Sequence, residues 1–326
     1  MDCATRGSIS VGSEVSWLLM RSTMSTRLRD EASFRRAELR SGMAAFAGQA
    51  AGVVLVGGRS LRMGAAKASL DWHGSTLLRR TLGVLDRAVD GPLLVVCARG
   101  QVLPEVPAQV EIVEDTQEGL GPMQGIAAGL AALAGRAHAA FVCSTDLPFL
   151  HPAFIRRALT ALTDDVDVVL PVVRGYPQPL AATYRISLAT LAAEAVAAGE
   201  LRPAFLCQRC ATLRLDEAAM LADPLLAAAD PALDSVVNVN SPDEYRAARR
   251  YPAPLVTVQC SEAGTTNQSE LRTVRAATLA GVTAALGLSL DSDMAAELNG
   301  DKISLDGDVP LVCGDTITFN LADRAK

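Results

Sequence analysis

Short apolar runs alternate with segments of helical spacing between residues 49 and 250. The runs are rich in Val, Leu and Ala and have the length of buried strands; they cover residues 52–56, 93–97, 110–113, 139–143 and 166–170. Apolar positions recur at helical intervals in the segments between and after them, at 76–89, 123–133, 152–162 and 188–198. This alternation predicts a doubly wound, mostly parallel α/β sheet of Rossmann-like type, covered by helices on both faces.

The N-terminal segment differs from this pattern. Residues 1–48 mix Ser, Thr, Gly and Arg without a sustained period, apart from a short helical stretch at 31–39. We therefore expect a disordered extension, within which Met20, Met24 and Met43 are alternative starts.

The pattern of apolar and polar positions changes again after residue 250. Pro252 and Pro254 predict a linker. Beyond them we expect a small α+β unit, with strands and one helix at 255–260, 278–286, 296–298 and 316–320. The predicted domains are thus 49–250 and 251–326.

The first predicted strand leads directly into paired glycines. Gly57 and Gly58 allow the backbone to approach phosphate oxygens without an intervening Cβ, so that amide N–H groups can donate to them. Arg62 and Lys67 add positive charge. The spacing matches neither G-x-x-x-x-G-K-[ST] nor G-x-G-x-x-G, which disfavours the folds that those motifs mark. We interpret the segment as a nucleotide-binding loop; a glycine turn followed by two exposed cations is the alternative.

Two other predicted strands end in carboxylates. Asp115 follows the third strand and precedes a glycine-rich helix start at 119–125, and Asp146 follows the fourth. Ligands of doubly wound sheets bind beyond the carboxyl ends of the strands, so we expect Asp115 and Asp146 at the same edge as Gly57. The alternative is that each aspartate caps the segment that follows it.

Composition narrows the class of protein. The chain has 326 residues, a formal net charge of −6 and 4% aromatic residues, which argues against a nucleic-acid-binding surface. No apolar run reaches the length of a membrane span. The 7 cysteines suggest free thiols in a reducing, cytoplasmic compartment. Cys207 and Cys210 form a Cys-x-x-Cys pair without a second pair at zinc-site spacing.

Together these segments resemble the molybdenum cofactor guanylyltransferases, which join GMP to the phosphate of molybdopterin. The likeness covers roughly residues 50–250, and it is carried by GVVLVGGRSLRMGAAKASL at 52–70, GLGPMQGIAAGL at 119–130, CSTDLPFL at 143–150, RGYPQPLAATYR at 174–185 and SVVNVNSPDEY at 235–245. Two positions depart from the family pattern, since Val56 replaces a small residue and Ala66 replaces an acid.

The resemblance implies that GMP passes from GTP to molybdopterin or its metal-loaded form, with release of pyrophosphate. Lys67, Arg62 and Asp146 would be catalytic, and Asp146 would hold Mg²⁺, which prefers hard oxygen ligands. The residues expected at the nucleotide or cofactor are Leu55, Val56, Gly57, Gly58, Ser60, Lys67, Asp115, Asp146, Asn238 and Asn240.

Asn238 and Asn240 are expected to face the pterin. They alternate on one face of a short predicted strand, and their amides can both donate and accept. The alternative is a polar turn after which Pro242 starts a helix.

The C-terminal unit resembles the β-grasp sulfur-carrier subunit of molybdopterin synthase. The likeness is carried by Leu298, Asn299, Gly300, Leu311, Gly314, Asp315, Ile317 and Phe319. Those carriers end in Gly-Gly, whereas the printed sequence ends in Ala325 and Lys326. We therefore expect this unit to carry no sulfur and to dock the enzyme to another cofactor-biosynthesis protein. We also expect a chain ending near Arg250 to fold and to transfer the nucleotide.

Three alternatives remain open at this point. The first is a cytidylyltransferase of the same cofactor, and the second is a nucleotidyltransferase acting on another small phosphate. The third is a nucleotide-binding scaffold without catalysis, which the alanine at position 66 makes worth testing.

Overall fold

The computed structural model describes residues 49–57, 66–115, 121–262, 271–290 and 294–321. The expected extension at 1–48 with its helix at 31–39 lies outside the described residues. Three of the predicted site residues also lie outside them, namely Gly58, Ser60 and Arg62.

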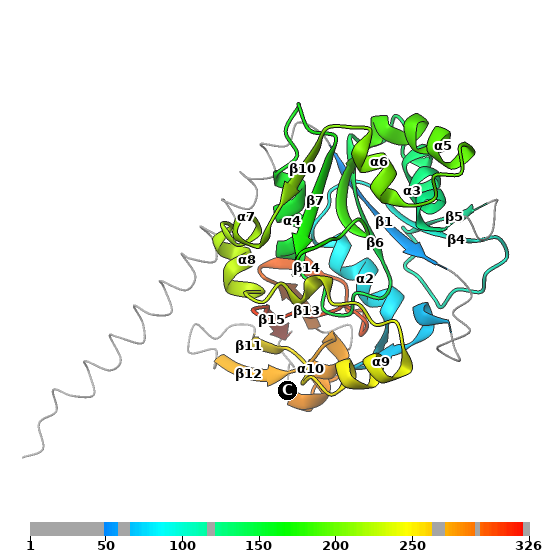
Figure 1. Ribbon diagram of the computed structural model, residues 1–326. Coiled ribbons are helices and arrows are strands. Elements are labelled where there is room, and N and C mark those ends of the chain that lie inside the picture. The colour runs from blue at the N-terminus through cyan, green and yellow to red at the C-terminus, as the bar shows by residue number, and fades with distance from the viewer. Residues whose placement is uncertain (1–48, 58–65, 116–120, 263–270, 291–293, 322–326) are drawn as a thin grey trace, which may run out of the picture. The chain divides into compact units, whose positions relative to one another are not determined.

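An eight-stranded sheet organises the first part of the chain (Figure 1). Its strand order is β10-β7-β9-β6-β1-β4-β5, with β8 paired to β7. The strands are β1 (Ala50–Val56), β4 (Leu93–Ala98), β5 (Glu111–Asp115), β6 (Ala139–Ser144), β7 (Val168–Val173), β8 (Tyr176–Pro177), β9 (Ala181–Arg185) and β10 (Thr212–Leu215). Along the main order every pairing is parallel except those of β9, which runs antiparallel to both β6 and β7. The predicted mostly parallel α/β sheet is confirmed.

The antiparallel direction of β9 was not predicted. It follows β7 after a connection that holds the short strand β8 and no helix. Parallel pairing needs a crossover of a dozen or more residues, so this connection leads to antiparallel pairing instead.

Helices cover both faces of the sheet (Figure 1). On one face α2 (Leu77–Asp86) and α4 (Pro152–Thr160) share an apolar cluster with Val54 and Val56. On the other, α3 (Gly121–Ala132), α5 (Ala189–Ala197) and α6 (Pro203–Gln208) cluster with Val53 and Leu55. Consecutive residues of β1 thus enter opposite cores, as strand geometry requires.

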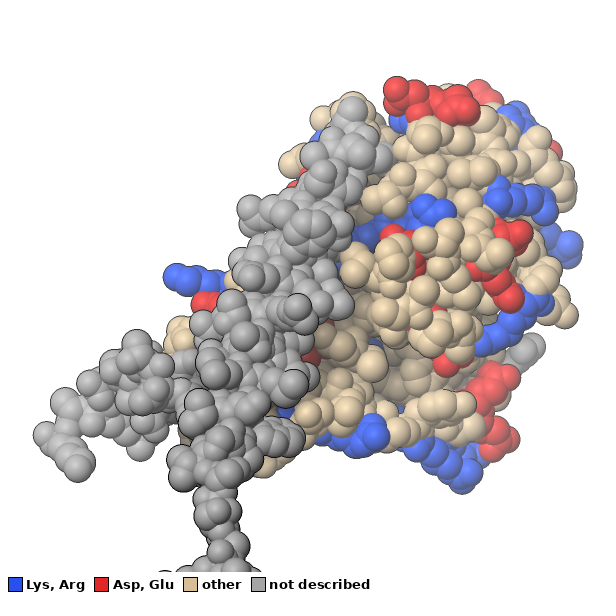
Figure 2. Space-filling model, turned by 90° about the vertical axis from the view of Figure 1, so that its left-hand side faces the viewer, with Lys and Arg blue, Asp and Glu red and all other residues tan. Residues whose placement is uncertain are grey.

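Shorter elements complete this part of the chain. They are η1 (Lys67–Ser69), β2 (Asp71–Trp72), β3 (Ser75–Thr76), η2 (Ile186–Leu188), α7 (Glu217–Leu221), α8 (Pro224–Ala229), η3 (Asp234–Val236) and α9 (Pro242–Arg249). None of the described helices is both long and apolar enough to cross a lipid bilayer. Figure 2 shows basic and acidic side chains interspersed over the face that it presents.

The C-terminal residues form a second, five-stranded mixed sheet. Its order is β12-β11-β15-β13-β14, built from β11 (Leu255–Glu262), β12 (Leu271–Arg275), β13 (Met294–Leu298), β14 (Asp301–Ile303) and β15 (Thr316–Leu321). The helix α10 (Leu279–Leu286) starts at Thr278, whose hydroxyl accepts from the N–H of Gly281 at 3.1 Å. Leu279 and Val282 of this helix pack with Phe319 of β15 in a separate apolar core.

The segment between β14 and β15 packs against α2 and α4, within one compact unit that spans residues 46–326. Val312 lies in the same apolar cluster as these helices. Arg87 donates to the carboxylate of Asp315 at 3.0 Å, and His151 Nε2 lies 3.2 Å from the carbonyl oxygen of Cys313. The sequence analysis predicted no such contact.

His151 is expected to make the stability of this packing depend on pH. Its Nδ1 accepts from the N–H of Ala153 at 3.1 Å as the N-cap of α4, so the neutral ring donates from Nε2 to Cys313. Burial lowers the pKa of His151 below its ordinary value. Because the unfolded chain then binds this proton more readily, the His151 contribution to stability is complete above about pH 6.5 and is lost as the pH falls below it.

We expect the free energy of unfolding to decrease when the pH is lowered from about 7 to about 5, and the slope to be smaller in His151→Asn. Asn can cap α4 with its side-chain oxygen but does not titrate. Denaturant unfolding at several pH values measures the slope. Burial also lowers the pKa of His73. His73→Asn is therefore measured alongside, because it shows how much of the slope comes from this second histidine. An unchanged slope in His151→Asn would contradict the assignment.

Candidate active site at the carboxyl edge of the sheet

The carboxyl ends of β1, β5 and β6 lie at the same edge of the sheet, because these strands are parallel to one another through β4 and β1. Gly57 follows β1 and is exposed, and Asp146 lies in the turn after β6, the direct neighbour of β1. Asp115 ends β5, which β4 separates from β1. The three residues therefore share the expected edge, with Asp115 at its far side.

Lys67 joins two of the predicted site residues. It opens η1, and its Nζ donates to Asp146 Oδ2 at 3.1 Å and to Asn240 Oδ1 at 2.9 Å. The side chains of Lys67 and Asp146 are 15% and 17% exposed, so this pair is shielded yet reachable from solvent. Segments far apart in the sequence thus place a cation, a carboxylate and an amide in direct contact.

The segment that carries the two asparagines is fixed by its backbone. The N–H of Val239 donates to the carbonyl oxygen of Asp146 at 2.9 Å, and the N–H of Asn240 donates to Glu244 Oε2 at 2.6 Å. Val239 is buried, whereas Asn238 and Asn240 are exposed. This alternation was expected, but residues 237–240 form no strand, and α9 begins just after them, as the alternative interpretation held.

Glu244 belongs to a capping box with Ser241, the N-cap of α9. Its carboxylate accepts from the N–H groups of both Asn240 and Ser241. The start of α9 therefore sets the position of Asn240 beside Lys67, which explains how a helix start and a site residue coexist here.

Asp146 is held by one more side chain that the sequence analysis missed. The hydroxyl of Ser144, the last residue of β6, hydrogen-bonds Asp146 Oδ1. No local signal in the sequence marks this contact between two side chains. Burial, with a further contribution from the Asp146 charge, raises the pKa of the neighbouring Cys143 thiol. Cys143 therefore stays protonated and is no nucleophile.

Leu55 and Val56 can face a ligand only through their backbone. Both side chains are buried, at 5% and 3% exposed, one in each core. Gly125, expected to help open the helix start, lies inside α3, where a Cβ would come within 3.2 Å of Leu55 Cδ2. Its function is therefore close packing of α3 on β1, and Gly121 is the glycine that starts the helix.

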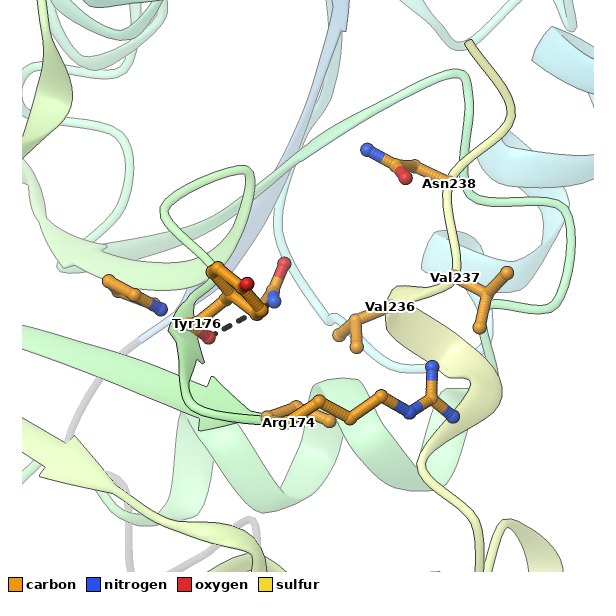
Figure 3. Close-up of a pocket in the computed structure, with 8 residues that line it drawn as sticks. Arg174, Tyr176, Val236, Val237 and Asn238 are labelled. Carbon is orange, nitrogen blue, oxygen red and sulfur yellow. Dashed lines mark hydrogen bonds between the residues drawn. The ribbon is translucent and has the colours of Figure 1, made fainter. Parts of the chain in front are cut away.

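Asn238 directly precedes Val239, which bonds the Asp146 carbonyl, and it lines a pocket of about 360 Å³ (Figure 3). The other lining residues come from the β7–β9 connection and the end of η3: Val173, Arg174, Tyr176, Pro177, Gln178, Val236 and Val237. Figure 3 shows Tyr176 on one side of the opening and Asn238 on the other. Arg174 is held by Asp234, with Nη2 at 2.8 Å from Oδ1. The pocket combines a guanidinium, amides and an aromatic ring.

Comparison with known proteins identifies the family. The profile described as "MobA-like NTP transferase domain" matches residues 52–212. A "Probable molybdenum cofactor guanylyltransferase" of Mycobacterium ulcerans (strain Agy99) is 40% identical over 188 residues, which cover 56% of this chain and 92% of the relative. The chain belongs to the molybdenum cofactor guanylyltransferase family.

Two further similarities were found. The relative named "Probable molybdenum cofactor guanylyltransferase" in Mycobacterium tuberculosis (strain ATCC 25618 / H37Rv) is 40% identical over 169 residues, 51% of this chain and 82% of that protein. A crystal structure of molybdopterin-guanine dinucleotide biosynthesis protein A from Archaeoglobus fulgidus is 24% identical, with a TM-score of 0.48, over 61% of this chain and 96% of that chain.

This member of the molybdenum cofactor guanylyltransferase family is a nucleotidyltransferase whose chain extends beyond the residues that match the family. The family profile ends at residue 212, so it does not include the C-terminal sheet at 255–321. Lys67, Asp146 and the pocket residues of the β7–β9 connection all fall within the matched residues.

The oxygen atoms of Asp146, Ser144 and Asn240 are chemically suited to one magnesium ion. In the described part of the chain no group of three or more His, Cys, Asp and Glu residues converges as a metal site. Mg²⁺ does not require one, because it binds through one or two carboxylates and completes its shell with water and substrate phosphates. Asp146 supplies a carboxylate, with the hard oxygens of Ser144 and Asn240 close by.

The Cys-x-x-Cys pair lies away from this cluster, at the end of α6 and just after it. Cys207 and Cys210 are both free, and Cys210 Sγ donates to the carbonyl oxygen of Leu206 at 3.2 Å. Burial raises the pKa of Cys207 to about 11 and also raises that of Cys210. Both thiols stay protonated at neutral pH, so neither is an activated thiolate.

Proposed function

We propose that this protein transfers GMP from GTP to the phosphate of molybdopterin or its metal-loaded form. The observation that carries the proposal is the contact of Lys67 with Asp146 and Asn240 at the carboxyl edge of the sheet, in a chain of this family. A lysine beside a strand-end carboxylate is suited to a triphosphate and its counterion.

In the proposed reaction an oxygen of the acceptor phosphate forms a bond to the α-phosphorus of GTP. The bond between that phosphorus and the oxygen bridging to the β-phosphate breaks, and pyrophosphate leaves with the electron pair. The attacking phosphate is already anionic, so the protein need not remove a proton. The barrier is lowered by positioning and by electrostatic stabilisation.

The site residues would have different roles in this reaction. Lys67 would stabilise the charge that develops on the phosphates, assisted by Arg62. Asp146 would hold Mg²⁺, which when bound neutralises the triphosphate and orients its oxygens. The backbone of Leu55, Val56, Gly57 and Gly58, with Ser60 and Asp115, would bind the nucleotide, in keeping with the exposure of Gly57 and the burial of the Leu55 and Val56 side chains.

The acceptor would occupy the pocket lined by Asn238. A molybdopterin combines a polar fused ring with a phosphate, and the pocket offers the Asn238 and Gln178 amides, the Tyr176 ring and the Arg174 guanidinium. Asn240, which accepts a hydrogen bond from Lys67, would lie on the phosphate side instead.

We expect GTP to bind more tightly than CTP, ATP or UTP. A site built to hydrogen-bond one base leaves its polar groups unpaired with another, which can cost up to about 10⁴-fold. Calorimetry with each nucleotide and Mg²⁺ measures the preference. Incubation of each with molybdopterin, followed by mass analysis of the dinucleotide, identifies the product. CTP binding as well as or better than GTP would favour the cytidylyltransferase alternative.

The finer assignments for the rest of the chain are also proposals. We propose that residues 251–326 form a β-grasp domain, a view supported by the strand order second-first-fifth-third-fourth and by the helix after the first hairpin. This domain would dock another cofactor-biosynthesis protein. We propose a cytoplasmic location, which the free state of the described cysteines supports.

A further inference from the structure

The segment 306–315, between β14 and β15, is linked through one side chain to the turn that carries Asp146. Arg80 of α2 connects the two. Its Nε donates to the carbonyl oxygen of Pro148 at 2.7 Å, and its Nη1 donates to the carbonyl oxygen of Leu311 at 3.1 Å. Pro148 lies two residues after Asp146, so one guanidinium bridges the turn that carries Asp146 and the segment that leads into β15 of the C-terminal sheet.

Arg80 is a charged residue at a buried position, which is unusual. It is only 7% exposed, and no carboxylate forms an ion pair with it among the described residues. Burial lowers the pKa of Arg80 to about 10, with a smaller contribution from the charge of Arg87. The guanidinium therefore remains charged at neutral pH while its neighbours are backbone carbonyls. Charge-assisted hydrogen bonds of this kind are stronger than neutral ones, and a buried cation without them is costly.

The C-terminal side of the bridge is held by hydrogen bonds to Asp315. Asp315, only 2% exposed, accepts from Arg87 Nη1 at 3.0 Å, from the N–H of Val312 at 2.8 Å and from Asn299 Nδ2 at 2.9 Å. These bonds tie the segment both to the C-cap of α2 and to the turn between β13 and β14. The Leu311 carbonyl that Arg80 contacts is therefore held from both sides.

Gly83 shows that α2 is shaped to receive this segment. A Cβ at Gly83 would lie 2.5 Å from both Cδ and Cγ of Pro310, closer than real Cβ contacts allow. Glycine inside a helix costs about 1 kcal/mol relative to alanine, so its presence needs a reason. The close seating of the Pro310 ring supplies that reason, and it sets the adjacent Leu311 carbonyl against Arg80.

We propose that Arg80 is a positioning residue through which the docked C-terminal sheet holds the Asp146 turn in its binding geometry. The proposal rests on the proposed function for the role of Asp146, but the coupling itself does not depend on turnover. The C-terminal sheet is then part of the transferase apparatus, and displacing it loosens the turn from a distance.

The test uses full-length Arg80→Met and Gly83→Ala. Arg80→Met removes both donors while keeping the length of the side chain. Gly83→Ala leaves every residue of the bridge in place and displaces Pro310. In both we expect amide hydrogen exchange over residues 145–149 to accelerate by about tenfold or more, the effect of losing a hydrogen bond to a charged donor. Exchange in β4 is expected to stay at the wild-type rate. The Mg²⁺ concentration for half-maximal GTP binding should rise by a similar factor.

Two controls separate positioning from general damage. Pro310→Ala removes the two atoms that a Cβ at Gly83 would meet, so Gly83→Ala/Pro310→Ala is expected to exchange more slowly at 145–149 than Gly83→Ala alone. Arg136→Met breaks an exposed ion pair with Glu111 that involves neither Pro148 nor segment 306–315, and it is expected to behave like wild type.

Wild-type exchange at 145–149 in a folded Arg80→Met and in Gly83→Ala would overturn the proposal. So would faster exchange spread equally over β4, because that marks a purely structural role. If wild-type protein releases no pyrophosphate from GTP and molybdopterin, the proposed function fails, while the exchange result still decides the coupling.

Discussion

Asp146→Asn is expected to abolish magnesium-dependent pyrophosphate release while leaving the fold intact. The substitution keeps the shape of the side chain and the backbone contact with Val239. It removes the negative charge that pairs with Lys67 and that we propose holds Mg²⁺. Lys67→Ala is expected to lower turnover by about 10²- to 10³-fold, the scale for loss of one electrostatic stabiliser.

The measurement is pyrophosphate release at saturating GTP and molybdopterin, with Mg²⁺ binding followed by calorimetry. Asp243→Asn is the matched control, since Asp243 is an exposed carboxylate that pairs with Arg246 on α9 and touches no site residue that the structure describes. Near wild-type turnover in both Asp146→Asn and Lys67→Ala would place the active site elsewhere.

Ending the chain at Arg250 is expected to lower the free energy of unfolding of the α/β part by several kcal/mol. Val312 lies in the core cluster formed with α2 and α4, and the Pro310 ring covers Gly83. Each buried apolar side chain contributes about 1.5–3 kcal/mol. The shortened chain keeps Lys67, Asp146 and Asn240, so its site would be complete in composition but less stable.

Chemical denaturation of the shortened and full chains measures this difference. Val312→Ala in the full chain tests the same contact without a deletion and is expected to cost about 1–3 kcal/mol, through lost burial and a small cavity. Equal stability of the shortened and full chains would show that the packing of segment 306–315 on α2 contributes nothing to the α/β part.

The sequence alone determined the parts of this protein that depend on local pattern. β1, β4, β5 and β6 match predicted apolar runs within a few residues, and α2 to α5 match the predicted helical periods. The aspartates at strand ends followed from the same pattern, because parallel strands bring their carboxyl ends to one edge. The family resemblance then predicted catalytic roles for Lys67 and Asp146.

Only the tertiary structure decided which of these residues touch. The sequence placed Asn240 with Asn238 toward the acceptor, whereas the fold directs Asn240 onto Lys67 and leaves Asn238 in the pocket. The antiparallel strand β9 and the bridge from Leu311 through Arg80 to Pro148 were equally absent from the pattern. The direction of β9 follows from the short connection after β7, which periodicity does not report. For the Asn240 contact and the Arg80 bridge the physical reason is different: periodicity reports which face of an element is buried, while partners distant in sequence are selected by packing, which no local pattern encodes.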